Sequence, residues 1–291
     1  MHEYITGAAQ YPFTRLNSWE NFAEKMKQWI FAGSQAAAQL LVFPEYAGME
    51  LVSLLPGHTA LTLQQQLAAL QRFAADFLDL HSQLARKYQV HILTGSLPLY
   101  VQGQYYNTAW FITPQGTSYA QTKNIMTRFE QEIWGISASP HPPAVVDCEL
   151  GKIGIAICYD SEFPLLVRHL TDQGAEVVLV PSCTDTVSGY WRVRIACQAR
   201  ALENQCYVVQ APTVGQVDWC EAIDVNIGAA GVFAPPDYGF PSDGVVAAGT
   251  LNEPAWVFAS VKRELLQQVR CHGQVLNNRD WRKQYKFAGK L

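Results

Sequence analysis

Three residues whose side chains could together carry out acyl transfer stand at the ends of predicted strands. Cys158 follows the β-branched run Lys152–Ile157, and Glu45 follows an apolar run that stops at Pro44. Lys123 ends a third segment, in which polar and apolar residues alternate. Because cysteine reacts as its thiolate, it needs a neighbouring base or cation at neutral pH. A carboxylate, a lysine and a thiol at three strand ends therefore predict a cysteine nucleophile with its activating partners.

Each of these residue types also has an ordinary structural interpretation. A free cysteine is more often a small buried hydrophobic residue, and a lysine at a strand end usually lies on the surface. A Cys–His pair is the commoner way to activate a thiol, but no histidine stands next to a strand end with a recognisable partner. We expect the histidines on the surface or in loops, at His58, His81, His91, His141, His169 and His272.

The chain resembles the nitrilase superfamily of carbon–nitrogen hydrolases, roughly from Tyr4 to Val269. The motifs that carry the resemblance are Phe43-Pro44-Glu45, Lys123, Cys158-Tyr159-Asp160 with Phe163-Pro164, and Arg200-Ala201-Leu202-Glu203-Asn204. Each motif alone is weak, but their order and context make the set specific. The resemblance implies a catalytic triad of Glu45, Lys123 and Cys158. Tyr-Asp after the cysteine, in place of Trp-Glu, indicates the amidase-like branch rather than true nitrilases.

The resemblance also implies a second glutamate a few residues after the lysine. Glu130 fits best, because the segment Phe129–Gly135 resembles the family pattern of Glu, three residues, Trp-Gly. Glu132 is the alternative that the sequence leaves open. The second glutamate is expected to orient the substrate or Lys123. The other interpretation is a solvated carboxylate in a polar loop.

The expected reaction is hydrolysis of a non-peptide C–N bond in a small linear amide. Glu45 takes the Cys158 proton, the thiolate attacks the carbonyl carbon, and Lys123 and the Tyr159 backbone N–H stabilise the oxyanion. Ammonia or an amine departs, and Glu45 activates water to hydrolyse the remaining thioester. No metal or organic cofactor is expected. The alternatives are a nitrilase, an acyltransferase in which an amine intercepts the thioester, and a non-catalytic binding or scaffold subunit; an intact triad argues against the last.

Charges near the nucleophile predict the kind of amide. Branches that handle carboxylate-bearing substrates place arginine just after Cys-x-Asp, where this chain has Ser161 and Glu162. Glu162 and Asp185 would repel a substrate carboxylate, and Trp134 and Tyr190 are expected to form apolar walls. We therefore expect a neutral or cationic amide as the substrate. The alternative is that Glu162 makes a structural ion pair.

Strands and amphipathic helices alternate along the chain, which predicts an α/β fold with helices outside mixed sheets. Helices are expected over Trp19–Gln39, Leu61–Tyr88, Pro164–Gln173, Tyr190–Asn204 and Lys262–Arg270. Strands are expected over Tyr4–Ala9, Leu40–Phe43, Val90–Leu97, Tyr105–Thr113, Ser118–Lys123, Lys152–Ile157, Val177–Val180, Cys206–Gln210, Ala229–Phe233, Gly244–Gly249 and Ala255–Ser260. The resemblance implies a four-layer α-β-β-α sandwich of two mixed β-sheets, with the active site between the sheets.

No linker rich in Pro, Gly or Ser divides the chain, so residues 1–270 are expected to form one carbon–nitrogen hydrolase domain. The tail, residues 271–291, lacks a core pattern. The resemblance implies that the tail reaches a subunit interface, where Trp281, Tyr285 and Phe287 would be apolar anchors. The chain is thus expected to form a homodimer or a larger homo-oligomer.

The composition argues against several classes of function. With 49% hydrophobic residues, 16% charged residues and a net charge of −4, the chain has no basic footprint for nucleic acid or an anionic membrane. The seven cysteines include no Cys-x-x-Cys and are too scattered to predict a zinc site or a disulfide framework. No secretory signal or membrane-spanning run is recognisable. A reducing cytoplasm, which would keep Cys158 as a thiol, is the expected location.

Overall fold

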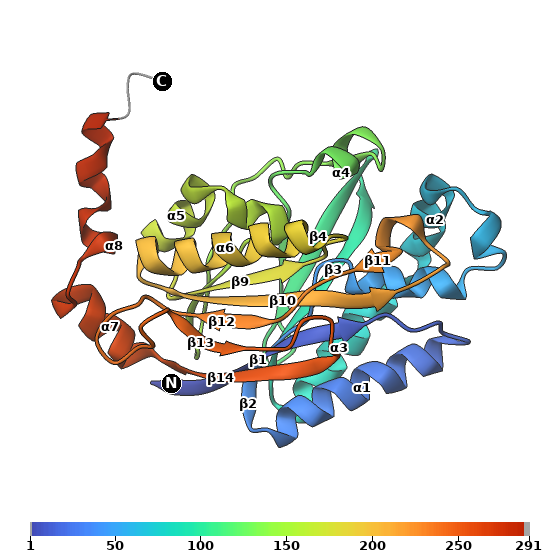
Figure 1. Cartoon of the computed structure of the whole chain (residues 1–291). Coiled ribbons are helices and arrows are strands. Elements are labelled where there is room, and N and C mark those ends of the chain that lie inside the picture. The colour runs from blue at the N-terminus through green and yellow to red at the C-terminus, as the bar shows by residue number, and fades with distance from the viewer. Residues whose placement is uncertain (1, 288–291) are drawn as a thin grey trace.

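The computed structural model describes residues 2–287, along which strands alternate with helices (Figure 1). The strands are β1 (Glu3–Pro12), β2 (Ala38–Val42), β3 (His91–Val101), β4 (Gln104–Ile112), β5 (Ser118–Thr122), β6 (Ile136–Ser137), β7 (Val146–Cys148), β8 (Gly151–Ile155), β9 (Val177–Ser182), β10 (Tyr207–Gln216), β11 (Val225–Asn226), β12 (Gly231–Phe233), β13 (Val245–Ala248) and β14 (Ala255–Lys262). The helices are α1 (Trp19–Gln35), α2 (Leu63–Leu70), α3 (Ala74–Tyr88), α4 (Arg128–Glu132), α5 (Pro164–Asp172), α6 (Val187–Asn204), α7 (Arg263–His272) and α8 (Asn277–Asp280).

Hydrogen bonding links the strands in the order β5-β4-β3-β2-β1-β10-β9-β8-β7, with the remaining short strands and β14 paired at the sides. Parallel pairs such as β8–β9 stand beside antiparallel pairs such as β3–β4, so the sheet is mixed. Two halves of this path meet where β1 and β10 pair at Tyr11–Thr213 and Pro12–Val214. The expected α/β class with mixed strand directions is confirmed. The separation into two sheets within a four-layer sandwich stays a prediction.

The strand β2 is apolar on both faces because both faces are covered. Leu41 packs into a core with the buried sides of α1 and α3, while Leu40 and Val42 point into a second core. The second core also holds β8, β9 and β10 and the inner sides of α5 and α6. Since successive side chains of a strand point to opposite faces, a strand covered on both faces needs an unbroken apolar run. This explains the runs Leu40–Phe43 and Val177–Val180.

The chain leaves two of these buried strands through strained turns. Tyr46, directly after Glu45, has φ 59°, and Cys158 has φ 48°. Both values lie in the left-handed region, which residues other than glycine enter at a cost of about 1–3 kcal/mol. The rigid strands on one side and the packed segments on the other hold these turns, and each turn carries one of the predicted catalytic side chains.

One long helix was expected over Leu61–Tyr88, and the structure instead has α2 and α3 joined by a 3₁₀ turn at Gln71–Phe73. The side chain of Gln71 explains the interruption. Its Nε2 donates to the carbonyl oxygens of Leu67 and Pro98, and its Oε1 accepts from the Tyr100 N–H. The helix is therefore tied to the end of β3 at this point, and the chain turns more tightly to allow these contacts.

Several predicted boundaries were wrong for local reasons. The helix expected over Tyr190–Asn204 begins at Val187, because the Thr186 side chain caps it by accepting from the Gly189 N–H. The strand expected to end at Gln210 continues to Gln216, where it pairs with β1 and β11. The expected helix Trp19–Gln39 ends at Gln35, and β2 starts at Ala38.

The histidines were expected on the surface or in loops, and two of them are not. His81 lies in α3 and His91 opens β3, and both side chains are buried. The ring of His81 packs against Phe77, with 4.4 Å between ring centroids, and its Nδ1 lies 2.7 Å from the Phe77 carbonyl oxygen. A ring nitrogen bonded within its own helix turn makes burial of the imidazole possible.

The tail after α7 leaves the body of the fold in Figure 1 as α8 and a further 3₁₀ segment. The start of this tail is bound to the domain: the Asn278 side chain donates to the Asn204 carbonyl oxygen, and the Arg168 guanidinium lies over the Trp281 ring. Tyr285 and Phe287 are exposed. The domain division at residue 270, the subunit interface and the homo-oligomer stay predictions. Among the described helices, none is long and apolar enough to cross a membrane.

Gly95 lies where β3 passes the turn that carries Glu45. Its φ is +77°, and a Cβ atom there would stand 2.3 Å from the Pro44 carbonyl oxygen. Gly103, in the turn between β3 and β4, has φ +90° with no atom near the position of a Cβ. We expect Gly95→Ala to lower the free energy of unfolding by about 2–5 kcal/mol, from backbone strain plus the clash.

The matched variant Gly103→Ala has the strain without the clash, so its expected cost is about 1–2 kcal/mol. Urea unfolding of both variants measures the difference. Equal losses for the two variants would show that the approach of β3 to Pro44 is not tight.

Candidate active site

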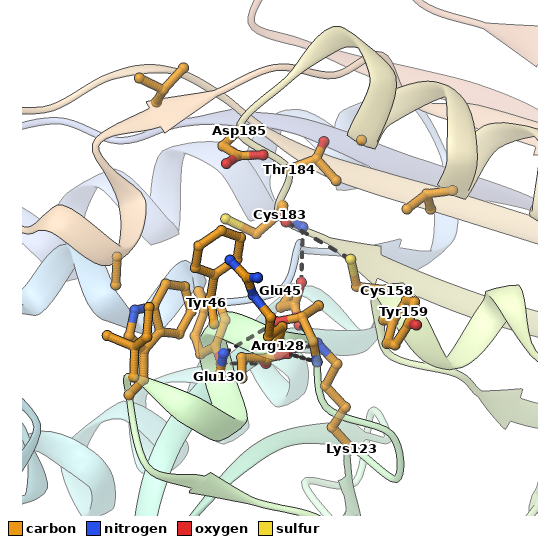
Figure 2. Close-up of a pocket in the computed structure, with 18 of the residues that line it drawn as sticks. Glu45, Tyr46, Lys123, Arg128, Glu130, Cys158, Tyr159, Cys183, Thr184 and Asp185 are labelled. Carbon is orange, nitrogen blue, oxygen red and sulfur yellow. Dashed lines mark hydrogen bonds and ion pairs between the residues drawn. The ribbon is translucent and has the colours of Figure 1, made fainter.

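A cavity of about 620 Å³ lies at the strand ends and is lined by loops after β2, β5, β8 and β9, by α4 and by the first turns of α6 (Figure 2). Glu45, Lys123 and Cys158, which the sequence placed at three separate strand ends, all line it. The fold brings them together because the strands that carry them end at the same side of the molecule. Glu130 lines the same cavity.

Lys123 is fully buried and lies between two carboxylates. Its Nζ is 2.7 Å from Glu45 Oε1 and 2.6 Å from Glu130 Oε2. Burial alone would lower the pKa of the lysine, but the Glu130 and Glu45 charges outweigh it and hold the pKa well above its usual value. Lys123 therefore stays protonated. One ammonium group balances the charge of only one carboxylate. If both Glu45 and Glu130 were ionised, one negative charge would be left without a partner.

The Glu130 carboxylate has more hydrogen-bond donors around it than the Glu45 carboxylate. Besides Lys123 it accepts from the Tyr46 hydroxyl at 2.6 Å and from the Thr127 N–H and hydroxyl, each at 2.9 Å. Burial opposes ionisation, but Lys123 and these donors lower the pKa of Glu130 below its usual value. Glu130 is thus ionised and fixes the position of the lysine ammonium group.

The structure places Glu130 in the cavity and Glu132 outside it. The Glu132 side chain is 65% exposed and lies 3.9 Å from Arg128, against 1% exposure for Glu130. Thr127 and Glu130 form a capping box at the start of α4, in which each side chain bonds the backbone N–H of the other. The spacing Thr-x-x-Glu is a recognisable signal of such a box, and it distinguishes Glu130 from Glu132 in the sequence.

The carboxylate of Glu45 has fewer donors and a higher pKa. It accepts from Lys123, from the Asn107 side chain at 2.9 Å and from the Cys183 backbone N–H at 3.0 Å. Burial, the largest effect, and the neighbouring Glu130 charge raise its pKa to about 7 in spite of Lys123. Of the two carboxylates, Glu45 is therefore the one that gains and loses a proton near neutral pH.

Cys158 lies beside Glu45 on its strained turn. Its Sγ is 3.9 Å from the Cys183 carbonyl oxygen. Burial, and next the Glu45 charge, raise the pKa of the thiol well above its usual value against the effect of Lys123. The resting cysteine is therefore a neutral thiol that needs a base. Tyr159 also lines the cavity, and its expected role as an N–H donor stays a prediction.

Asp160 is a functional candidate that the sequence reasoning used only as part of a motif. Its buried carboxylate accepts from the backbone N–H groups of Asn124, Ile125 and Ile157, at 2.7–3.2 Å. Burial raises the pKa of Asp160 to about 6. Because it bonds the residues just after Lys123 and the residue just before Cys158, Asp160 ties the lysine strand end to the cysteine turn.

Of the predicted substrate-binding residues, Trp134, Glu162 and Asp185 line the cavity and Tyr190 does not. Tyr190 is a buried residue of α6, and its hydroxyl accepts from Arg194 at 2.9 Å. Since α6 begins at Val187, Gly189 and Val193 face the cavity, one helical turn apart. Tyr190 is rotated from that face by about 100°, the turn of one residue in a helix.

The cavity also contains charged residues that the sequence reasoning did not select. Arg192 lines the cavity, with Nε 3.8 Å from Glu162 Oε1. Arg128, Glu221 and Asp224 line it as well. Arg128 adjoins the motif around Glu130, while the two acids come from a loop for which no sequence signal was available.

Comparison with known proteins gives the family. A sequence model of the carbon–nitrogen hydrolase family matches residues 5–250. The probable hydrolase YhcX of Bacillus subtilis is 36% identical over 274 residues, which are 94% of this chain and 53% of YhcX. The chain thus spans about half the length of that relative. The deaminated glutathione amidase of Synechocystis is 28% identical, with 96% of this chain and 99% of the relative covered.

Solved structures share the fold. The carbon–nitrogen hydrolase from Helicobacter pylori has a TM-score of 0.75 at 17% identity, covering 93% of this chain and 92% of that chain. An amidase from Nesterenkonia sp. has a TM-score of 0.67 at 22% identity, covering 96% of each chain. The resemblance to carbon–nitrogen hydrolases that was drawn from the motifs is confirmed, and this chain belongs to the carbon–nitrogen hydrolase family.

Proposed function

We propose that this chain hydrolyses a small linear amide through a thioester on Cys158. The observation that carries the proposal is the neutral Cys158 thiol beside Glu45, a buried carboxyl whose pKa lies at about 7. Membership of a hydrolase family and relatives named as amidases support amide hydrolysis. One mutant of the Nesterenkonia amidase is described with an acetamide group covalently added at its active-site cysteine, which supports a covalent step at the corresponding thiol here.

In the proposed reaction each residue has one role. Ionised Glu45 takes the thiol proton as sulfur attacks the carbonyl carbon, so that no free thiolate has to exist beforehand. Lys123, together with the Tyr159 N–H, stabilises the oxyanion. Protonated Glu45 then returns the proton to the leaving nitrogen, and its carboxylate next takes a proton from the water that cleaves the thioester. Glu130 holds Lys123 in place throughout.

We expect Cys158→Ala to abolish turnover and to leave the fold intact, because the side chain supplies the bond to the acyl group and contributes little else. The measurements are amide hydrolysis, the circular dichroism spectrum and the midpoint of thermal unfolding. Cys271→Ser, at an exposed thiol, is the control and should keep full activity. Turnover by Cys158→Ala near the parental rate would exclude this nucleophile.

Trapping separates hydrolysis from acyl transfer and from a non-catalytic scaffold. Intact-mass analysis after rapid quenching should show the acyl group on the parent protein but not on Cys158→Ala. Hydroxylamine should compete with water for this thioester. If added amines capture nearly all the acyl group at low concentration, acyl transfer is the better description of the activity.

The pH dependence follows from Glu45. Its carboxyl must be ionised to accept the thiol proton, so kcat/KM should fall as the pH drops through about 7. Because the pKa values of Cys158 and Lys123 are raised well above their usual values, the profile should stay flat through the range where an ordinary thiol ionises. Glu45→Gln should remove the acid limb and lower kcat/KM by about 100–10,000-fold.

Glu132→Gln is the matched control, because it makes the same change at an exposed glutamate that lies outside the cavity. It should keep both the rate and the acid limb. An acid limb near 7 that survived in the residual activity of Glu45→Gln would assign that ionisation to another group.

We also propose that the cavity prefers neutral or amine-bearing amides to carboxylate-bearing ones. Glu162, Asp185, Glu221 and Asp224 contribute negative charge to the lining. Arg192 offsets part of the charge of Glu162. A half-buried carboxylate facing a substrate carboxylate costs about 1–3 kcal/mol, so discrimination of about tenfold or more is expected.

The test is the ratio of kcat/KM for two amides of equal length that end in an amine or a carboxylate. The amine should be preferred in the parent, and Glu162→Arg should narrow or invert the preference. Deaminated glutathione, an anionic amide, belongs in the same panel because relatives are named for it. Preference of the parent for the anionic members would make Glu162 a structural residue.

A further inference from the structure

A second cluster of reactive side chains lies at the end of β8 opposite to Cys158. One donor atom each from His91, Cys148 and Glu149 lies within 4.8 Å of the other two. Gly151 begins β8 beside this cluster, and Cys158 follows the far end of the strand. At about 3.3 Å per residue the two places are roughly 20 Å apart, so the cluster is separate from the cavity described above.

The cluster joins parts of the fold that are distant in sequence. His91 opens β3, which lies in the half of the strand order that holds β2. Cys148 closes β7 and pairs with Gly151, so Glu149 stands in the turn to β8, at the far end of the other half. A link between these side chains therefore holds the β7–β8 turn against β3.

The ring of His91 faces an oxygen at each nitrogen. Its Nδ1 is 3.3 Å from the Gln39 carbonyl oxygen, and its Nε2 is 3.2 Å from Glu149 Oε2. Neither oxygen can donate while the carboxylate is ionised. A neutral imidazole has one N–H, so one ring nitrogen points its lone pair at an acceptor. Burial of the ring against Phe111 disfavours the doubly protonated form that would satisfy both.

A metal ion removes this conflict. With Nδ1–H donating to the Gln39 carbonyl oxygen, Nε2 is free to bind a cation, which is the usual second-sphere arrangement of a metal-binding histidine. The same cation would be bound by Glu149 and by Cys148, whose coordinating thiol releases its proton to solvent.

We propose that His91 Nε2, Cys148 Sγ and Glu149 Oε2 form a binding site for Zn²⁺. An imidazole, a thiolate and a carboxylate suit zinc, whereas a thiolate disfavours Mg²⁺ and Ca²⁺. Bonds of about 2.0–2.3 Å in a tetrahedral site need donors about 3.3–3.8 Å apart. The nitrogen and the carboxylate oxygen, 3.2 Å apart, lie just short of this spacing, and the thiol sulfur lies within 4.8 Å of both, so small side-chain rotations bring the three donors to it. Water completes the coordination.

The site is structural, because it stands far from Cys158 and crosslinks the two halves of the fold. The spacing of the cysteines in the sequence gave no sign of it, since only Cys148 takes part and His91 is more than fifty residues away in the chain. Saturating Zn²⁺ should raise the midpoint of thermal unfolding by about 5 °C at a hundredfold excess over the dissociation constant.

The experiment uses the full chain with Cys158→Ala, so that the thiol in the cavity cannot supply a second site. After treatment with a chelator, Zn²⁺ is titrated in competition with a chromophoric chelator, and Co²⁺ is added separately for absorption spectra. We expect one tightly bound Zn²⁺ per chain and, with Co²⁺, a thiolate-to-metal charge-transfer band together with the strong visible bands of tetrahedral cobalt.

Cys148→Ser and Glu149→Gln change residues that are not fully buried and should still fold. Each should weaken Zn²⁺ binding by at least about 100-fold, since even second-sphere changes cost 10–100-fold. Cys148→Ser should also lose the charge-transfer band. Cys271→Ser, at an exposed thiol, should leave the Zn²⁺ affinity and the charge-transfer band unchanged. No tight uptake of Zn²⁺, or uptake that is equal in Cys148→Ser and in the Cys271→Ser control, would overturn the proposal.

Discussion

The buried ammonium group of Lys123 is the constraint on which the candidate site depends. A charge taken out of water must be paired, and removal of one partner of such a pair typically costs about 3–5 kcal/mol. Here one lysine serves two carboxylates, Glu45 and Glu130. Glu130 has the additional donors and stays ionised, so the excess negative charge is relieved at Glu45. The same arrangement that stabilises the lysine therefore leaves a carboxyl that titrates near neutral pH beside a thiol.

Backbone strain places these groups within reach of one another. The left-handed conformations of Tyr46 and Cys158 turn the chain sharply at the ends of buried strands, so that the adjacent side chains face the cavity. Such conformations persist only when their surroundings hold them. The close approach of Gly95, the carboxylate of Asp160 and the capping box at Thr127 supply that support. None of these three belongs to the proposed triad. Gly95 packs against the turn of Glu45, Asp160 ties the Lys123 strand end to the Cys158 turn, and the capping box holds Glu130, which in turn bonds Lys123.

The two halves of the strand order are joined by polar contacts as well as by their shared core. At the end that carries the candidate site, the Cys183 N–H after β9 bonds Glu45 after β2. At the other end, His91 on β3 meets Glu149 in the β7–β8 turn. Both contacts cross between segments that meet only in the folded chain. The proposed zinc site would strengthen the second contact, while the charge balance around Lys123 depends on the first.

The sequence by itself determined the family, the α/β class and the strand ends that carry Glu45, Lys123 and Cys158, because unbroken apolar runs mark strands covered on both faces. A Thr-x-x-Glu signal that separates Glu130 from Glu132 is also present in the sequence, but the family pattern left both residues open, and the capping box seen in the structure decided between them. The tertiary structure alone decided which other groups meet in the cavity. Tyr190 and Arg192 both lie in α6, and the placement of that helix in the fold decided that Arg192 lines the cavity and that Tyr190 does not. His91 on β3 and Cys148 on β7 lie on strands that do not pair with each other. They came together only because the two halves of the strand order pack against a shared core, which local sequence patterns do not encode.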